Sequence, residues 1–115
     1  MLLVLVVDDD DAVRPMVADL TEAMGHHVLV AANGADALAI LEGEAIDILI
    51  TDIVMPGMNG YELAERAHRL RPDMAILCMT AFPLAQGNAL NCSAVLRKPF
   101  RAAQLKAALD SIATG

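Results

Sequence analysis

Short aliphatic runs alternate along the chain with stretches in which apolar residues recur every three or four positions. Aliphatic runs of this kind are typical of buried strands, whereas the wider spacing is typical of one face of a helix. The predicted strands are Leu2–Val7, Val28–Ala31, Asp47–Thr51, Ala75–Met79 and the short run Ala94–Leu96. The predicted helices are Val13–Met24, Ala35–Leu41, Tyr61–Leu70 and Arg101–Ile112.

Turn-forming residues separate these elements. Gly25 and Gly43 stand where helices are expected to end. Residues 82–93 contain Pro83, Gly87 and further turn formers, so we predict no more than a short helical turn there. Strands that alternate with helices favour βαβ crossovers, which build a parallel sheet covered by helices on both sides. The predicted fold class is therefore α/β with five strands.

The composition fits one domain with a mainly aliphatic core. The chain has 115 residues, of which 57% are hydrophobic, but it has no Trp, one Tyr and two Phe. At roughly 100–200 residues per domain, this length corresponds to a single domain, residues 1–115. The apolar run Met1–Val7 is too short to cross a bilayer and lacks the flanks of a secretory signal. We therefore expect a cytoplasmic protein.

Charge narrows the classes of partner. Eight Lys and Arg against fifteen Asp and Glu give a formal net charge of −7. This surplus repels phosphate backbones and anionic lipid, so direct binding to nucleic acid or to a membrane surface is disfavoured.

The two cysteines indicate no metal site. Cys78 lies inside an apolar run and Cys92 in a polar stretch, without the spacing of metal ligands. Two cysteines are also too few for a disulfide scaffold. We therefore expect both to be reduced thiols without a function of their own.

Charged and hydroxyl side chains follow four of the five predicted strands. The positions after the first, third, fourth and fifth strands hold Asp8 and Asp9, Asp52, Thr80, and Arg97 and Lys98, respectively. Ligands of open parallel sheets bind outside the carboxyl ends of the strands, so these side chains are expected to converge at one edge. Asp10 and Asp11 continue the acidic run, and we interpret them as partners of the following helix N-terminus.

This set of residue types favours phosphoryl transfer. Carboxylates that lie close together repel each other and raise each other's pKa unless a cation sits among them. A hard divalent ion such as Mg²⁺ takes oxygen ligands and keeps positions open for phosphate oxygens. A lysine and a hydroxyl would bind the other phosphate oxygens, and a carboxylate can itself be the nucleophile. The sequence therefore predicts a magnesium-dependent phosphoryl-transfer site, in which a carboxylate can serve as the nucleophile and form an aspartyl phosphate.

Four motifs resemble those of the receiver domain of two-component response regulators. They are Val6–Asp9, Thr51–Gly60 with its Met-Pro-Gly turn, Met79–Ala81, and Lys98–Phe100, in the family's order and at its approximate spacing. The resemblance implies a flavodoxin-like fold with strand order 2-1-3-4-5. It also implies phosphorelay signalling, in which a sensor histidine kinase or a phosphotransfer domain donates the phosphoryl group and an unknown output protein or domain responds.

The resemblance assigns a role to each matching residue. The phospho-acceptor is expected to be Asp52. The expected Mg²⁺ ligands are Asp8 through water, Asp9, Asp52 and the backbone carbonyl of Val54. The residues expected to bind the phosphoryl group are Thr80, Ala81 and Lys98, the last followed by a cis peptide bond to Pro99.

Three departures from the family pattern change what is expected of the switch. The aromatic residue that normally precedes the lysine by three positions is Val95 here. The segment between Thr80 and Lys98 is shorter than usual, so the fourth helix of the family fold is expected to be shortened. Two positions that tune hydrolysis of the aspartyl phosphate hold Val54 and Phe82, which offer an attacking water no hydrogen bond. We therefore expect a long-lived phosphoryl group and an output that avoids the usual fourth-helix, fifth-strand face.

Two other functions remain open at this level. A haloacid-dehalogenase-type phosphohydrolase would use Asp9 as nucleophile, with Asp11, Val13, Thr80 and Lys98 matching its motifs, but it leaves Asp52 unexplained. A receiver that is never phosphorylated would serve only for docking. In either receiver interpretation the chain is expected to be free-standing or part of a hybrid kinase or longer regulator, and not a metabolic enzyme.

Overall fold

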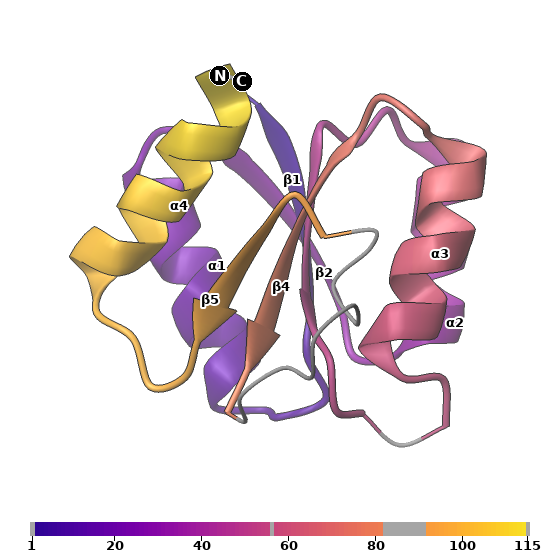
Figure 1. The fold of residues 1–115 in the computed structure, drawn as a ribbon, viewed down its shortest axis with the longest axis horizontal. Helices are drawn as coiled ribbons and strands as arrows, with labels where there is room; N and C mark the ends of the chain where they lie inside the picture. The colour runs from indigo at the N-terminus through magenta and orange to yellow at the C-terminus, as the bar shows by residue number, and fades with distance from the viewer. Residues whose placement is uncertain (1, 56, 82–91, 115) are drawn as a thin grey trace.

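A five-stranded parallel sheet forms the centre of the computed structural model, which describes residues 2–55, 57–81 and 92–114 (Figure 1). The strands are β1 (Leu3–Val7), β2 (His27–Ala31), β3 (Ile48–Asp52), β4 (Ala75–Thr80) and β5 (Ala94–Arg97). They lie in the order β2-β1-β3-β4-β5, and each neighbouring pair is parallel. This topology confirms the predicted α/β class and the flavodoxin-like strand order.

Helices cover both faces of the sheet. Within the described residues they are α1 (Val13–Ala23), α2 (Gly34–Gly43), α3 (Gly60–Leu70) and α4 (Ala102–Thr114). In Figure 1, α1 and α4 lie on one side of the sheet and α2 and α3 on the other. The expectation of a shortened helix between the fourth and fifth strands concerns residues 82–91, which lie outside the described residues.

The core has two layers because successive strand residues point to opposite faces. In β1, Val4 and Val6 pack with α1 and α4, while Leu5 and Val7 pack with α2 and α3. All four side chains are fully buried. A strand with helices on both faces has no polar side, which explains the unbroken aliphatic run at the start of the chain.

Strands β3, β4 and β5 each end one residue later than predicted, so three residues that were expected to follow strands are part of the sheet. Asp52 is the last residue of β3 and pairs with Met79, while Thr80 is the last residue of β4 and pairs with Arg97. Asparagine side chains cap the N-termini of α2 and α3: the Asn33 side chain accepts from the Asp36 N–H, and the Asn59 side chain accepts from the Glu62 N–H.

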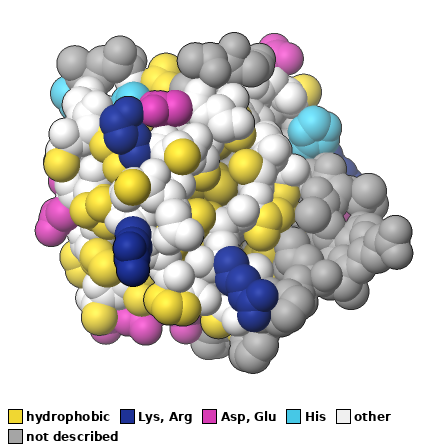
Figure 2. All heavy atoms as spheres, turned by 60° about the vertical axis from the view of Figure 1, so that its left-hand side comes forward, with side chains coloured by type: hydrophobic (Ala, Val, Ile, Leu, Met, Phe, Trp, Pro, Cys, Tyr) yellow, Lys and Arg dark blue, Asp and Glu magenta, His cyan; other side chains and the backbone are white. Residues whose placement is uncertain are grey.

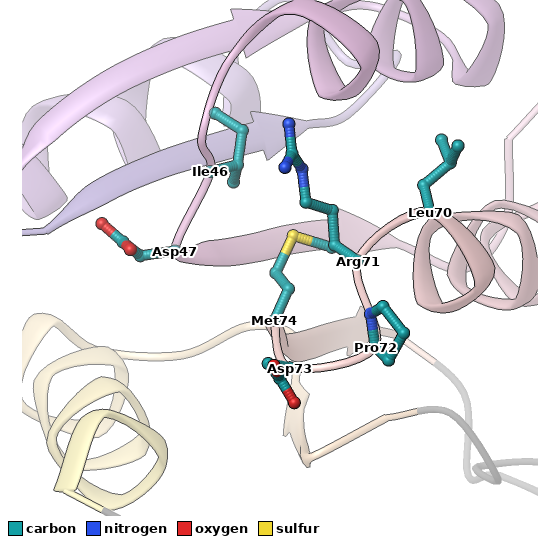
Figure 3. Close-up of a pocket in the computed structure, with 7 residues that line it drawn as sticks. All are labelled: Ile46, Asp47, Leu70, Arg71, Pro72, Asp73 and Met74. Carbon is teal, nitrogen blue, oxygen red and sulfur yellow. The ribbon is translucent and has the colours of Figure 1, made fainter.

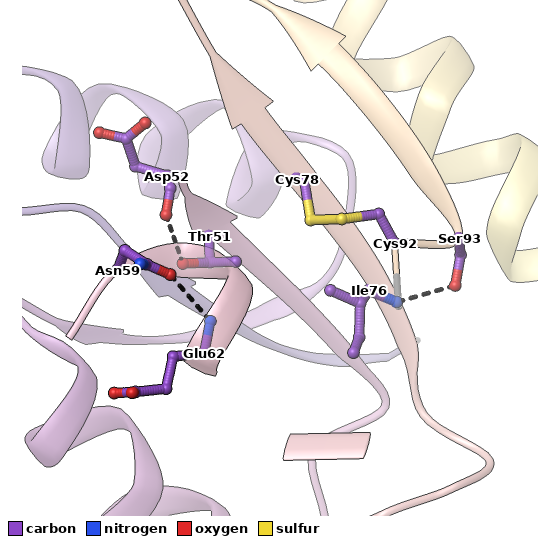
Figure 4. The surroundings of a disulfide bond; sticks show 8 residues. All are labelled: Thr51, Asp52, Asn59, Glu62, Ile76, Cys78, Cys92 and Ser93. Carbon is purple, nitrogen blue, oxygen red and sulfur yellow. Dashed lines mark hydrogen bonds between the residues drawn. A yellow bond between two sulfur atoms is a disulfide. The ribbon is translucent and has the colours of Figure 1, made fainter. Parts of the chain in front are cut away.

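The expectation of two reduced cysteines is wrong, because Cys78 and Cys92 form a disulfide (Figure 4). The pairing follows from the topology. Cys78 stands opposite Val95 in the parallel β4–β5 ladder, so the chain entering β5 passes close to Cys78. The two Cα atoms lie 5.8 Å apart, within the usual range for a disulfide. Separately, none of the helices in the described part of the chain is long and apolar enough to span a membrane.

Candidate functional site

Three carboxylates meet at the carboxyl ends of β1 and β3. One oxygen from each of Asp8, Asp9 and Asp52 lies within 4.8 Å of the others. The register pairs Val7 with Thr51, which brings the residues after β1 beside the end of β3. These two strands flank the point where the strand order reverses, the usual place for a ligand in an open α/β sheet.

Lys98, the residue directly after β5, joins this cluster. Its Nζ lies 2.9 Å from Asp8 Oδ2 and 3.4 Å from Asp52 Oδ2. The Lys98 N–H donates to the Thr80 carbonyl at 2.7 Å, and the peptide bond between Lys98 and Pro99 is cis. The lysine is therefore held at the site by its backbone as well as by its two ion pairs.

Burial and charge shift the ionisation of the site. Asp8 is fully buried, Asp52 is 8% exposed and Asp9 is exposed. Burial and the nearby Asp8 charge raise the pKa of Asp52, although Lys98 opposes them. Burial alone would lower the pKa of Lys98, but the hydrogen bond and charge of Asp8, together with Asp52, outweigh it and raise that pKa.

The loop after β1 is organised by its own aspartates. Asp8 Oδ1 accepts from the Asp10 N–H at 2.9 Å. Asp10 Oδ1 in turn accepts from the backbone N–H groups of Ala12 and Val13, and these bonds lower the pKa of Asp10. The interpretation of Asp10 as a partner of the helix start is thus confirmed, since both donors stand at the beginning of α1.

Two residues that the sequence analysis did not single out also shape the site. Arg14 Nη1 donates to the Asp8 carbonyl at 2.8 Å, and its Nη2 pairs with Asp11 at 2.7 Å. Gly60 begins α3 directly against β3, where an added Cβ would collide with the Asp52 carbonyl oxygen. Nothing in the order of residues signals the arginine, whereas Gly60 was visible only as part of the Met-Pro-Gly motif.

The remaining candidates lie around the cluster. Thr80 is buried at the end of β4, and Ala81 follows it at the surface. Val54 is 59% exposed just beyond Asp52, and Val95 is exposed on the edge strand β5, so no aromatic side chain covers that position. Phe82 lies outside the described residues.

Two hollows border different ends of the sheet. One, of about 360 Å³, is mostly apolar and lined in part by Val13, Met16 and Phe100, with Lys98 forming its link to the carboxylates. The other lies at the opposite end of the strands, near the starts of β3 and β4, and is lined in part by Arg71 (Figure 3). There the guanidinium donates to the carbonyls of Leu41 and Glu44, which makes it a structural clamp on the end of α2.

Comparison with known proteins identifies the family. A model of the response regulator receiver domain matches residues 4–110. The chain belongs to the response regulator receiver domain family. The motifs found in the sequence therefore lie in the fold that the resemblance implies, and the strand order agrees with that of the family's solved structures.

Relatives of this receiver domain occur alone and within larger proteins. It is 39% identical over 104 residues to the response regulator receiver protein CpdR of Brucella abortus (strain 2308), and the match covers 87% of each chain. It is 38% identical over 85 residues to the sensor histidine kinase RcsC of Salmonella typhimurium. That match covers 74% of this chain but 9% of the kinase, so the receiver corresponds to a small part of that protein.

Solved structures agree over nearly the whole receiver domain. Chemotaxis protein CheY4 of Vibrio cholerae has a TM-score of 0.91 at 30% identity, with 97% of this chain and 98% of that chain covered. The response regulator TrrA of Thermotoga maritima, solved in complex with Mg²⁺-BeF, also has a TM-score of 0.91, at 27% identity, with 97% and 99% covered. These similarities favour a receiver over a phosphohydrolase. A phosphohydrolase with Asp9 as nucleophile would leave Asp52, at the end of β3, without a role.

Proposed function

We propose that Asp52 accepts a phosphoryl group from the phosphohistidine of a histidine kinase or phosphotransfer domain, in a reaction that requires Mg²⁺. The observation that carries the proposal is the position of Asp52 beside Asp8, Asp9 and Lys98. Asp8 already shares one oxygen with Lys98 and the other with the Asp10 N–H, and Asp9 is solvent-exposed. Asp52 is therefore the carboxylate best placed to be the nucleophile.

The donor set fits a magnesium ion. It offers carboxylate oxygens from Asp8, Asp9 and Asp52, the hard ligands that Mg²⁺ prefers. The mutual repulsion that helps raise the pKa of Asp52 is the kind of repulsion that a divalent cation relieves. When bound, Mg²⁺ would neutralise charge that develops on the phosphoryl oxygens. The backbone carbonyl of Val54 is proposed as a further ligand.

Each residue of the site has its own role in phosphoryl transfer. An Asp52 carboxylate oxygen forms the new P–O bond while the P–N bond breaks and its electron pair returns to the histidine nitrogen. Lys98 neutralises one phosphoryl oxygen, and Thr80 and Ala81 bind the group after transfer. The domain, residues 1–115, thus acts as a phosphorylated signalling switch with slow self-catalysed loss of phosphate, and not as an enzyme that turns over a diffusible substrate.

The apolar hollow next to the site suits the phosphohistidine donor. Lys98 lines both the hollow and the acidic cluster, so a helix that docks there would bring its histidine toward Asp52. Met16 is 44% exposed at its rim. Figure 2 brings the side covered by α1 and α4 forward and shows hydrophobic side chains over its middle, with Lys and Arg among them and Asp and Glu toward the border. Such a surface is suited to an acidic, amphipathic helix.

The decisive experiment locates the modified residue. The protein is incubated with acetyl phosphate and Mg²⁺, and the added phosphate is mapped by mass spectrometry. We expect it on Asp52, with none on the Asp52→Asn variant. Phosphate on Asp9 would instead indicate the phosphohydrolase, and no phosphate on any residue would indicate a docking module.

The docking face is tested by separating the donor from the chemistry. We expect Met16→Glu to slow transfer from a kinase phosphohistidine but to leave phosphorylation by phosphoramidate unchanged. Leu70→Glu is the matched control, since Leu70 is exposed to a similar extent on α3, beside the Arg71 hollow and not the apolar one. Equal transfer to both variants would refute this face as the docking site.

A further inference from the structure

The disulfide lies on the strand that reaches the phosphorylation site. Cys78 is two residues before Thr80 on β4. The carbonyl of Met79, between them, accepts from the Ile53 N–H, and the carbonyl of Thr80 accepts from the Lys98 N–H. The end of β4 is therefore hydrogen-bonded to the residue after Asp52 on one side and to Lys98 on the other.

Two hydrogen bonds hold the chain next to Cys92 against β4, and neither of them depends on the disulfide. The Ser93 N–H donates to the Ile76 carbonyl at 2.7 Å, and the Ile76 N–H donates to Ser93 Oγ at 3.0 Å (Figure 4). Ser93 follows Cys92 directly and Ile76 lies two residues before Cys78. Reduction would break neither bond, so the thiols would stay within reach of each other and the disulfide could form again.

The two cysteines differ in access. Cys78 is fully buried in the core beside α3, whereas Cys92 is partly exposed. Attack by an external thiolate is therefore directed to the sulfur of Cys92, because exchange depends on which sulfur can be reached.

We propose that Cys78 and Cys92 form a redox-active disulfide whose state controls how readily Asp52 is phosphorylated. The reductant is a dithiol. Its thiolate attacks the Cys92 sulfur to form a mixed disulfide, and Cys78 leaves as a thiolate that takes up a proton. The second reductant thiol then displaces Cys92, which is protonated in turn. Two electrons reach the receiver, and the reductant becomes a disulfide.

The coupling runs along the end of β4. The disulfide ties Cys78 to Cys92, and the next two residues of β4 are hydrogen-bonded to Ile53, which follows Asp52, and to Lys98. A phosphoryl group on the nearly buried Asp52 requires Thr80 and Lys98 to adjust around it, and a cross-link two residues before Thr80 limits that adjustment. Reduction is therefore expected to favour the phosphorylated state, and this half of the inference rests on the proposed function.

The test compares oxidised and reduced protein directly. One sample is equilibrated with oxidised glutathione and the other is reduced with dithiothreitol, which is then removed without air. Free thiols are counted by alkylation and mass spectrometry, and phosphorylation of Asp52 by acetyl phosphate and Mg²⁺ is followed over time. We expect faster phosphorylation of the reduced form by roughly fivefold or more, within the usual range of coupling between linked sites.

Variants at each step distinguish the possible outcomes. Cys92→Ser should be phosphorylated under both treatments at the rate of the reduced wild type. Ser93→Ala should form its disulfide more slowly than wild type.

If both cysteines are alkylated after treatment with oxidised glutathione, no disulfide forms and the proposed redox site is wrong. A disulfide that forms and breaks with equal phosphorylation rates would overturn the coupling. If neither form is phosphorylated, the proposed function and the coupling both fail, whereas reversible thiol labelling would still establish the redox site.

Discussion

Lys98 lies closer to Asp8 than to Asp52, with its Nζ 2.9 Å from the first carboxylate and 3.4 Å from the second. Asp8 is completely buried, so its negative charge has little contact with water and depends on this lysine. The pair therefore supports the fold as well as the site, and substitution of the lysine will affect both.

The first prediction concerns this pair. Lys98→Met should lower the free energy of unfolding by about 2–4 kcal/mol, because it leaves a buried carboxylate without its partner. The double variant Asp8→Asn, Lys98→Met should recover part of this loss, because the isolated charge is then absent. Urea unfolding in EDTA measures both values. A loss below about 0.5 kcal/mol for the single variant would show that Asp8 does not depend on Lys98.

The second prediction concerns Asp52 in the metal-free protein. Its pKa is raised in the folded state by burial and by Asp8, so the folded protein favours the protonated acid. That contribution is complete below the ordinary aspartate pKa of about 3.9 and is lost as the pH rises through the raised value. Asp52→Asn stays neutral, so at pH 7 in EDTA its melting temperature should exceed that of wild type by roughly 2–6 °C.

Two further measurements check the origin of this difference. It should disappear near pH 3, where both side chains are neutral, and it should shrink in Mg²⁺, which stabilises only a folded protein that binds it. A difference that stays constant from pH 3 to pH 7 would mean that the ionisation of Asp52 is not its cause.

Much of this architecture could be predicted from local patterns. Neighbouring residues alone indicate the aliphatic strand β1 and the turn that follows it. Once the strands are known to be parallel, the residues that follow them must lie at the same end of the sheet. The sequence could predict that Lys98 and Asp8 lie at the same end of the sheet, but not that they touch. The two residues are 90 positions apart, and the distance between them depends on the register of the strands. The Cys78–Cys92 bond was missed for the same reason, because the expected strand order places β5 beside β4 but does not give the register that sets Cys78 opposite Val95, three residues after Cys92.

The third prediction concerns the close approach of α3 to β3. Gly60→Ala should weaken Mg²⁺ binding and destabilise the fold by about 1–3 kcal/mol, because its methyl group would displace the backbone at Asp52 and Ile53. Gly43→Ala is the matched control, since an added Cβ at the end of α2 meets nothing within 4 Å. Calorimetric Mg²⁺ titration and urea unfolding of both variants measure the effect. Equal results for the two variants would show that the helix N-terminus can move away from Asp52 without consequence.

The fourth prediction concerns the lifetime of the phosphoryl group, and it rests on Val54. This side chain is 59% exposed two positions after Asp52. The resemblance to receiver domains implies that the attacking water passes this position. A valine cannot hydrogen-bond that water, whereas an asparagine can orient it for attack. Val54→Asn should therefore shorten the half-life of phosphoryl-Asp52, measured as acyl-phosphate decay after the donor is removed.

The matched control for this measurement is Val30→Asn, which makes the same substitution at another exposed valine, on the edge strand β2. We expect Val30→Asn to decay at the wild-type rate, because it places no polar group beside Asp52. Val54→Asn should decay faster by roughly tenfold, because an amide that orients the attacking water lowers the barrier to hydrolysis. If wild type loses its phosphate as fast as Val54→Asn, water reaches the phosphorus without help from this position, and the exposed valine does not protect the acyl phosphate.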